Sequence, residues 1–214
     1  MKPRVPPHIA AIKPYEPGKP VEELEREYGV PNAVKLASNE NPLGPSPKAV
    51  EAIRLAASGV HFYPDGGGYY LRRKLAGRLG VAMENVVLGC GSNELLDLLA
   101  RAYLAPGDEA VMGEQAFVIY RHATASTGAK AVRVPMKDHA HDLRAMADAV
   151  GPRTRIVFVA NPDNPSGTIV RRAEVEAFLR RVPEDVLVVM DEAYFEYARR
   201  DPDYPDSMEG FSED

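Results

Sequence analysis

Some polar residues that can bind a small molecule directly follow short apolar runs. Asp191 ends the run VLVVM (residues 186–190), which is rich in β-branched side chains and too short for an ordinary helix. Such a run predicts a strand buried on both faces. An acid at the carboxyl end of a central parallel strand lies where open α/β sheets bind their ligands. Asp191 is therefore the first candidate for chemistry, and nearby Tyr194 is the second.

Two further motifs follow predicted strands in the same way. GCGSNE (residues 89–94) precedes a helical pattern, and a helix start with small residues can bind a phosphate. NPDNPSGT (residues 161–168) follows the apolar run RIVFVA. Taken alone, each is also explained as an ordinary loop, with Ser92 as a helix cap in the first. Because parallel strands end at one edge of a sheet, we expect both motifs to lie close to Asp191.

Other chemistries fit parts of these motifs less well. GCGSNE with Glu114 is similar to a dinucleotide-binding fingerprint, but the third glycine is missing and Glu94 would face the pyrophosphate. VLVVMDE is similar to the acidic strand of nucleoside-triphosphate hydrolases, but the chain has no G-x-x-x-x-G-K-[ST] loop. DHAHD offers His139 and His141 to a metal without a third ligand, which favours a solvated turn. We expect no metal.

The composition is typical of a soluble globular protein: 45% of the 214 residues are hydrophobic and 27% are charged. A net charge of -5 provides no basic surface for nucleic acid or for a membrane. The single cysteine, Cys90, excludes an intrachain disulfide, and we expect it to be a small core residue. No run approaches the roughly 18 apolar residues of a membrane span, and residues 1–15 contain no apolar run of the kind found in a signal peptide, so we expect none. These features predict a cytoplasmic protein that acts on small molecules.

From residue 85 onward, strand-like and helix-like segments alternate. The expected strands are 85–89, 109–113, 131–135, 155–160 and 186–190, and the expected helices are 92–104, 117–127, 142–150 and 171–181. This alternation predicts an α/β fold with a mainly parallel sheet and helices on both faces.

The amino-terminal quarter has a different pattern. Residues 1–20 are rich in proline and predict an extended arm, and residues 21–29 predict a short polar helix. Residues 35–47 begin as a short strand and continue as a loop, after which Ser46 and Pro47 start a helix that ends near residue 57. We expect residues 1–45 to form an arm, a short helix and a substrate-side loop, and residues 46–214 to form an incomplete large domain.

The ordered motifs SNENPLG, YPDG, GSNE, an aromatic residue at 117, NPDNPSGT and DEAYFEY resemble those of the fold-type-I, pyridoxal-phosphate-dependent aminotransferases. Within that family they are most similar to the histidinol-phosphate aminotransferases, and the likeness extends from Tyr15 to Tyr197. It implies pyridoxal 5'-phosphate as cofactor. It also implies amino-group exchange between L-histidinol phosphate and 2-oxoglutarate in histidine biosynthesis. Aromatic amino acids, or a threonine phosphate in a decarboxylating relative, are alternative substrates.

The resemblance implies a role for each matching residue. Asp191 pairs with the pyridine nitrogen and keeps it protonated, so that the ring can accept electrons. Asn164 and Tyr194 hydrogen-bond the phenolic oxygen, and Phe117 stacks on the ring. Alone, Phe117 and Tyr63 are each better explained as ordinary core or surface aromatic residues. The phosphate-binding turn matches Gly91, Ser92 and Asn93.

Three residues of the amino-terminal quarter match the family at the substrate side and at the subunit interface. Tyr63 corresponds to a residue that reaches into the cofactor site of the neighbouring subunit, which implies a homodimer. Tyr15 and Asn41 match the arm and the loop that close over the substrate.

One feature of the family is missing. A lysine after the DEAY strand forms a Schiff base with the cofactor and moves the substrate proton, but the last lysine here is Lys137. We therefore expect the chain to be truncated before that lysine, to lack the C-terminal small domain and to be inactive alone. A non-catalytic cofactor-binding or assembly remnant that pairs with a complete subunit is the alternative of another class.

Overall fold

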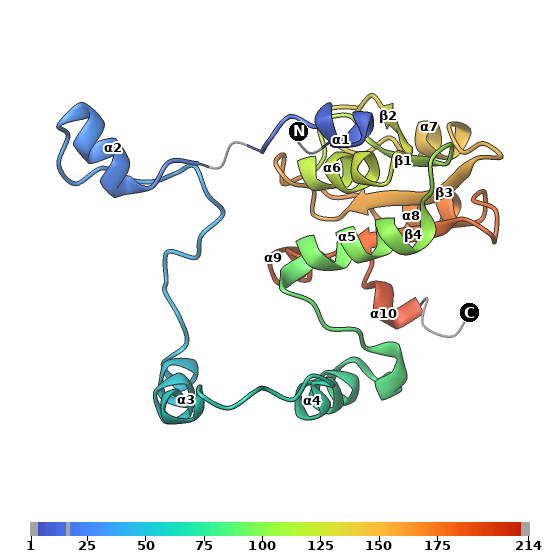
Figure 1. Ribbon diagram of the computed structural model, residues 1–214. Coiled ribbons are helices and arrows are strands. Elements are labelled where there is room, and N and C mark those ends of the chain that lie inside the picture. The colour runs from blue at the N-terminus through green and yellow to red at the C-terminus, as the bar shows by residue number, and fades with distance from the viewer. Residues whose placement is uncertain (1–3, 16–17, 211–214) are drawn as a thin grey trace. The chain divides into compact units, whose positions relative to one another are not determined.

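The computed structural model describes residues 4–15 and 18–210 (Figure 1). By its contacts the chain divides into two compact units, one comprising Met1–Lys13 and Arg72–Asp214 and the other Pro14–Leu71. The expected boundary between residues 45 and 46 concerns the domains of the whole protein and stays a prediction.

Within the described residues, the first unit contains a four-stranded, fully parallel sheet with the strand order β2-β1-β3-β4. The strands are β1 (Glu109–Gly113), β2 (Lys130–Val134), β3 (Thr154–Ala160) and β4 (Leu187–Asp191). Four of the five predicted strands thus lie within about one residue of the observed ones. The register pairs Ala160 with Asp191, so β3 and β4 end side by side.

Helices cover both faces of this sheet, as predicted (Figure 1). One face packs against α5 (Gly91–Tyr103) and α6 (Val118–Ser126), and the other against α7 (Leu143–Asp148) and α8 (Arg172–Leu179). Successive side chains of a strand point to opposite faces. In β3, Ile156 and Phe158 therefore pack with α5 and α6, whereas Val157 and Val159 pack with α7 and α8, and all four are fully buried.

The described part of the first unit contains five further helical elements. They are α1 (Pro7–Ala10), α4 (Tyr69–Leu79), which crosses the boundary between the units in the sequence, η2 (Met83–Asn85), α9 (Phe195–Ala198) and α10 (Ser207–Gly210). Helix α1 packs against α6 and corrects the prediction of an arm that is extended throughout residues 1–20. Proline at the first helical position is compatible with a helix because the missing N–H would be unpaired there.

The predicted strand at residues 85–89 is wrong. Val86 has extended backbone angles (φ -108°, ψ 116°). An extended segment becomes a strand only when a neighbouring strand supplies hydrogen bonds, and the described residues contain no such neighbour for this segment. Instead, the Val86 carbonyl accepts a hydrogen bond from Arg72 Nε at 3.0 Å, and Val87 is 70% exposed.

The second unit contains α2 (Val21–Tyr28), α3 (Pro47–Ala56) and η1 (Ala57–Gly59). None of its described residues is buried, so its helices form on local signals instead of packing. Ser46 and Pro47 start α3 as predicted, and Gly29 ends α2 with φ +66°. The expected short strand near residue 35 does not form, because it has no partner to complete a ladder.

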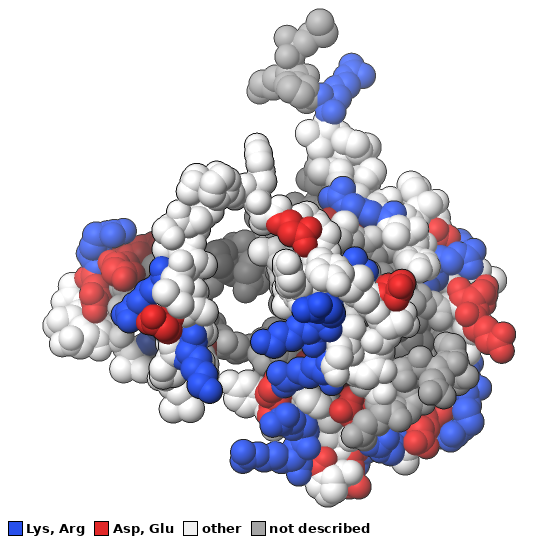
Figure 2. Space-filling view, turned by 90° about the horizontal axis from the view of Figure 1, so that it is seen from below, with Lys and Arg blue, Asp and Glu red and all other residues white. Residues whose placement is uncertain are grey.

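The described surface has mixed charge. In the face shown in Figure 2, basic and acidic side chains are interspersed. In the described part of the chain, no helix has the length and apolarity needed to cross a membrane.

Candidate functional site

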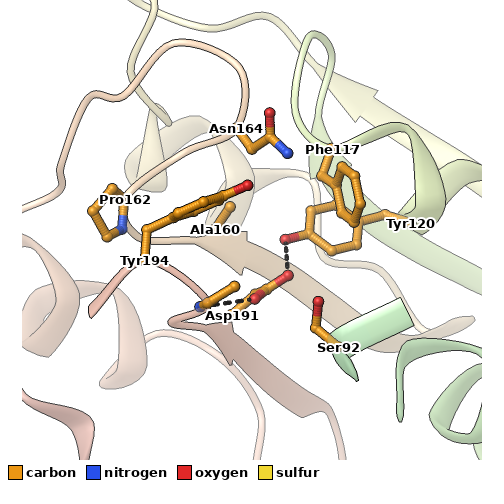
Figure 3. A pocket seen from close by; sticks show the side chains of 9 residues that line it. Ser92, Phe117, Tyr120, Ala160, Pro162, Asn164, Asp191 and Tyr194 are labelled. Carbon is orange, nitrogen blue, oxygen red and sulfur yellow. Dashed lines mark hydrogen bonds between the residues drawn. The ribbon is translucent and has the colours of Figure 1, made fainter. Parts of the chain in front are cut away.

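A small pocket that is partly open to solvent lies where β3 and β4 end (Figure 3). Its lining comes from four segments: Ser92 of α5; Phe117 and Tyr120 at the start of α6; Ala160, Pro162 and Asn164 at and after the end of β3; and Asp191, Ala193 and Tyr194 at and after the end of β4. Three of these segments converge because they follow β1, β3 and β4, and the loops after parallel strands leave from one edge of the sheet. Ser92 joins them because α5 packs on the same face of the sheet as α6.

Asp191 supplies a negative charge to this pocket and is held in place by two donors. Its Oδ2 accepts a hydrogen bond from the Tyr120 hydroxyl at 2.8 Å, and its Oδ1 accepts one from the Ala193 backbone N–H at 3.2 Å. Donors of this kind stabilise the ionised carboxylate and fix its orientation. A carboxylate has about four acceptor positions, so Asp191 can still accept a hydrogen bond from a cationic ligand.

The sequence did not predict four of the residues that line the pocket, Tyr120, Ala160, Pro162 and Ala193, and of these Tyr120 has the polar side chain. Its fully buried ring stacks on Phe158 with centroids 4.9 Å apart and makes an edge contact with Phe117 at 5.8 Å. Burial, reinforced by the Asp191 charge, raises the pKa of Tyr120, so the hydroxyl stays protonated and donates. The available signal was its spacing: residues 117 and 120 are three apart, which places them on one face of a helix.

Ser92 lies in the first turn of α5 and brings the positive end of a 13-residue helix to the pocket. The first turn of a helix leaves backbone N–H groups without helical partners, and these can bind an anion. Gly91 has φ +72°, a conformation that glycine adopts readily. Gly91 and Asn93 flank Ser92 and are exposed. Glu94 accepts a hydrogen bond from the Cys90 backbone N–H, so its charge is engaged next to this turn.

The other side chains of the pocket suit a flat ring. Phe117 presents an aromatic face, and in Figure 3 the Asn164 amide and the Tyr194 hydroxyl point into the space beside it. The amide and the hydroxyl can both donate hydrogen bonds to an oxygen on such a ring. Together with Asp191 and the start of α5, they fit a flat, cationic heterocycle that carries a phosphate.

Three predicted residues belong to the second unit, so the structure does not test their relation to this pocket. Tyr63 is fully exposed, Tyr15 is 57% exposed, and the Asn41 side chain accepts a hydrogen bond from the Leu43 N–H at 3.0 Å. Their roles stay predictions.

The remaining sequence candidates have other surroundings. Within the described residues, no group of three or more His, Cys, Asp or Glu side chains is placed to hold a metal. In the DHAHD segment, His139 is exposed and His141 is buried. Cys90 is exposed, not in the core as predicted, because it lies at the N-cap of α5 after a segment that forms no strand.

Comparison with known proteins identifies the family. The family model "Aminotransferase class I and II" matches residues 31–213. The chain belongs to this aminotransferase family. The aminotransferase chain is 52% identical over 200 residues to the histidinol-phosphate aminotransferase of Moorella thermoacetica, an alignment that covers 94% of this chain and 52% of the relative. It is 51% identical over 213 residues to histidinol-phosphate aminotransferase 2 of Methylococcus capsulatus, covering 97% and 57%.

A solved structure supports the same assignment. The crystal structure of histidinol-phosphate aminotransferase from Sinorhizobium meliloti, in complex with pyridoxal-5'-phosphate, matches the aminotransferase chain with a TM-score of 0.85 and 34% identity. The match covers 96% of this chain and 55% of that one. The predicted family and fold class are confirmed, and the aminotransferase chain spans about half the length of the relatives that it matches.

Proposed function

We propose that the protein is a pyridoxal-phosphate-dependent aminotransferase of histidine biosynthesis. It transfers the amino group of L-histidinol phosphate to 2-oxoglutarate and forms imidazole acetol phosphate and L-glutamate. One observation carries the proposal: the Asp191 carboxylate, fixed by the Tyr120 hydroxyl, shares a pocket with Ser92 at the start of α5. A cation and a phosphate therefore find complementary groups in one pocket. The names of the most similar relatives support the choice of substrate.

The pocket residues orient the cofactor and control its charge. When bound, the cofactor supplies an electron sink for the carbon that exchanges its amino group. Asp191 would accept a hydrogen bond from the pyridine nitrogen and hold the proton there. Phe117 would pack on one face of the ring and exclude water from it. Asn164 and Tyr194 would donate hydrogen bonds to the phenolic oxygen.

The start of α5 would hold the phosphate. The Ser92 hydroxyl and the backbone N–H groups of Ser92 and Asn93 would bind it, because these donors lie at the positive end of the helix. The Gly91 N–H already donates to the Gly89 carbonyl at 2.9 Å, so Gly91 would contribute by leaving room for the phosphate.

We extend the proposal to the location of the protein, to its subunit arrangement and to three residues outside the pocket. The protein acts as a cytoplasmic homodimer, Tyr63 completes the cofactor site of the neighbouring subunit, and Tyr15 and Asn41 contact the substrate. Exposed apolar side chains of the second unit support an interface role, since Leu36, Leu43 and Tyr63 are 90%, 91% and 101% exposed. The activity needs a lysine beside the cofactor, and the described lining of the pocket includes none. Lys137, the last lysine of the sequence, is exposed and pairs with Ala140 in an isolated bridge away from this lining.

The test compares amino donors with the complete gene product. We expect the highest kcat/KM for L-histidinol phosphate with 2-oxoglutarate, measured as glutamate formed. A higher value for an aromatic amino acid or a threonine phosphate would refute the proposed substrate, and no transfer from any donor would refute the enzyme class.

The 214-residue chain is tested separately by incubation with pyridoxal phosphate and reduction with borohydride. We expect no transaminase activity and no lysine adduct at the site. A stable lysine adduct at the site, found by mass spectrometry, would contradict the predicted need for a further lysine.

A further inference from the structure

His141 and Asp163 form a buried ionisable pair beside the pocket. His141 Nε2 lies 3.3 Å from Asp163 Oδ1, and each side chain is 1% exposed. In the described part of the chain, neither imidazole nitrogen of His141 has a well-formed hydrogen bond. The Asp163 Oδ1 atom also lacks one. Burial of a carboxylate is unfavourable unless a partner compensates it. The imidazole is the group placed to do so.

Asp163 shapes the loop that carries Asn164. Its Oδ2 accepts hydrogen bonds from the Ser166 hydroxyl at 2.7 Å and the Ser166 N–H at 3.3 Å. Its backbone N–H donates to the Thr168 carbonyl at 2.9 Å, and its carbonyl accepts from the Gly167 N–H at 2.8 Å. These bonds close the turn in which Asn164 is the residue after Asp163. A shift of Asp163 would therefore move the backbone from which the Asn164 side chain enters the pocket.

The imidazole is itself confined on its other sides. A Cβ atom added to Gly113, at the end of β1, would lie 2.6 Å from His141 Nδ1, so the ring packs directly on the strand backbone. The next residue, Asp142, caps α7 through its side chain, which accepts the N–H of the third helical residue at 3.0 Å. The Thr168 hydroxyl also donates to the His139 carbonyl at 2.9 Å. His141 thus fills a fixed place between β1 and the loop after β3.

We propose that His141 is a positioning residue for the cofactor. By holding the buried Asp163 carboxylate, it fixes the loop so that the Asn164 amide donates to the phenolic oxygen of pyridoxal phosphate. This inference rests on the proposed function. It gives His141 a role that differs from the metal-ligand alternative suggested by the DHAHD segment.

The experiment measures how tightly the complete gene product, freed of cofactor, binds two ligands. One is pyridoxal 5'-phosphate, and the other is its 3-deoxy analogue, which lacks the phenolic oxygen. His141→Leu keeps similar bulk but cannot pair with Asp163, and His141→Gln keeps an N–H donor near the position of Nε2. We expect His141→Leu to weaken binding of pyridoxal phosphate about tenfold, which corresponds to the loss of one hydrogen bond. Binding of the analogue should change less than about threefold, and His141→Gln should recover most of the loss.

One control variant and one alternative test variant separate this effect from general damage. His139→Asn replaces the exposed histidine of the same turn. His139 has φ +64°, and asparagine tolerates that conformation. It should leave both affinities within about twofold. If His141→Leu does not fold, Asp163→Asn replaces it as the test variant, because it removes the charge with little change of shape. It should show the same selective loss in a smaller degree.

The outcomes are distinguishable. If the folded variant binds both ligands equally more weakly than wild type, or binds both as tightly as wild type, the proposed role of His141 is overturned. The substitution would then not affect the hydrogen bond to the phenolic oxygen. A wild-type protein that binds neither ligand would instead overturn the proposed function.

Discussion

The hydrogen bond between Tyr120 and Asp191 predicts a measurable loss of stability in Tyr120→Phe. The substitution removes one hydroxyl and leaves the ring stacked on Phe158, so nearly all the packing is kept. A hydrogen bond to an ionised group contributes about 1.5–3 kcal/mol. Because Asp191 is only half-buried, water replaces part of the lost interaction, and we expect the lower end, about 1–2 kcal/mol. With a urea m-value of about 2 kcal/mol/M, the midpoint of unfolding falls by about 0.5–1 M.

The assay is urea unfolding of the cofactor-free protein, and a double-mutant cycle assigns the partner. In an Asp191→Ala background, Tyr120→Phe should cost less than about 0.5 kcal/mol, because the acceptor is gone. Tyr103→Phe is the control, since Tyr103 lies on α5 and is 53% exposed; it should change stability by at most about 0.5 kcal/mol. An equal cost of Tyr120→Phe with and without Asp191 would refute the reasoning.

The same hydroxyl predicts a pH dependence with a defined sign. Burial and the Asp191 charge raise the pKa of Tyr120 above the ordinary value of 10.0 in the folded state. The stability that the protonated hydroxyl contributes is therefore complete below pH 10 and is lost as the pH rises, because only the unfolded chain then releases the proton. At pH 11 the difference in unfolding free energy between wild type and Tyr120→Phe should be smaller by about 1.4 kcal/mol than at pH 8. A difference that stays constant or grows would contradict this assignment.

Three further substitutions test other contacts. Asp191→Asn removes the charge that holds the pyridine proton and should lower kcat of the complete gene product about 30-fold or more, measured as glutamate formed; an unchanged kcat would exclude the proposed pairing. Ser92→Ala should weaken binding of pyridoxal phosphate about fivefold to tenfold in a fluorescence titration, the effect of one hydrogen bond, whereas equal affinity would place the phosphate elsewhere. Tyr204→Phe should destabilise the cofactor-free protein by about 1–2 kcal/mol in urea, because the buried hydroxyl donates to the Asn161 carbonyl; no change would show that water replaces this bond fully.

The sequence predicted those features that depend on local pattern. RIVFVA forms a buried strand because its apolar, β-branched residues fit the interior of a parallel sheet. VLVVM also forms a strand, but the predicted burial on both faces is wrong: β4 lies at the edge of the sheet in the described residues, and each residue from Leu187 to Asp191 is only half-buried there. Once both strands are parallel neighbours, their ends must meet, so the convergence of Asn164 and Asp191 follows from the strand assignment alone. The pattern of NVVLG is similar, yet it forms no strand, because pairing needs a partner that the segment itself cannot supply.

Tyr120 shows why the rest of the site was not predicted. Its position in a helical pattern is equally that of a core aromatic residue, and in fact it is one, fully buried against Phe158. Its second role as a donor depends on how closely α6 packs on the sheet beside the end of β4, a distance that no local pattern specifies. His141 and Asp163 are similar, since each lies in a turn-like segment and only the tertiary structure brings them together.

The site therefore depends on the packing of the core that faces α5 and α6. The ring planes of Tyr120 and Phe158 are within 4° of parallel, so Phe158 sets the height of the tyrosine above the sheet. The hydroxyl at the end of that ring then sets the orientation of the Asp191 carboxylate, 71 residues away in the sequence. Because packed side chains leave little free space to absorb a displacement, a change in the volume of residue 158 is transmitted to the carboxylate. The charge that we propose to bind the cofactor is thus positioned by an apolar contact on the far side of the tyrosine.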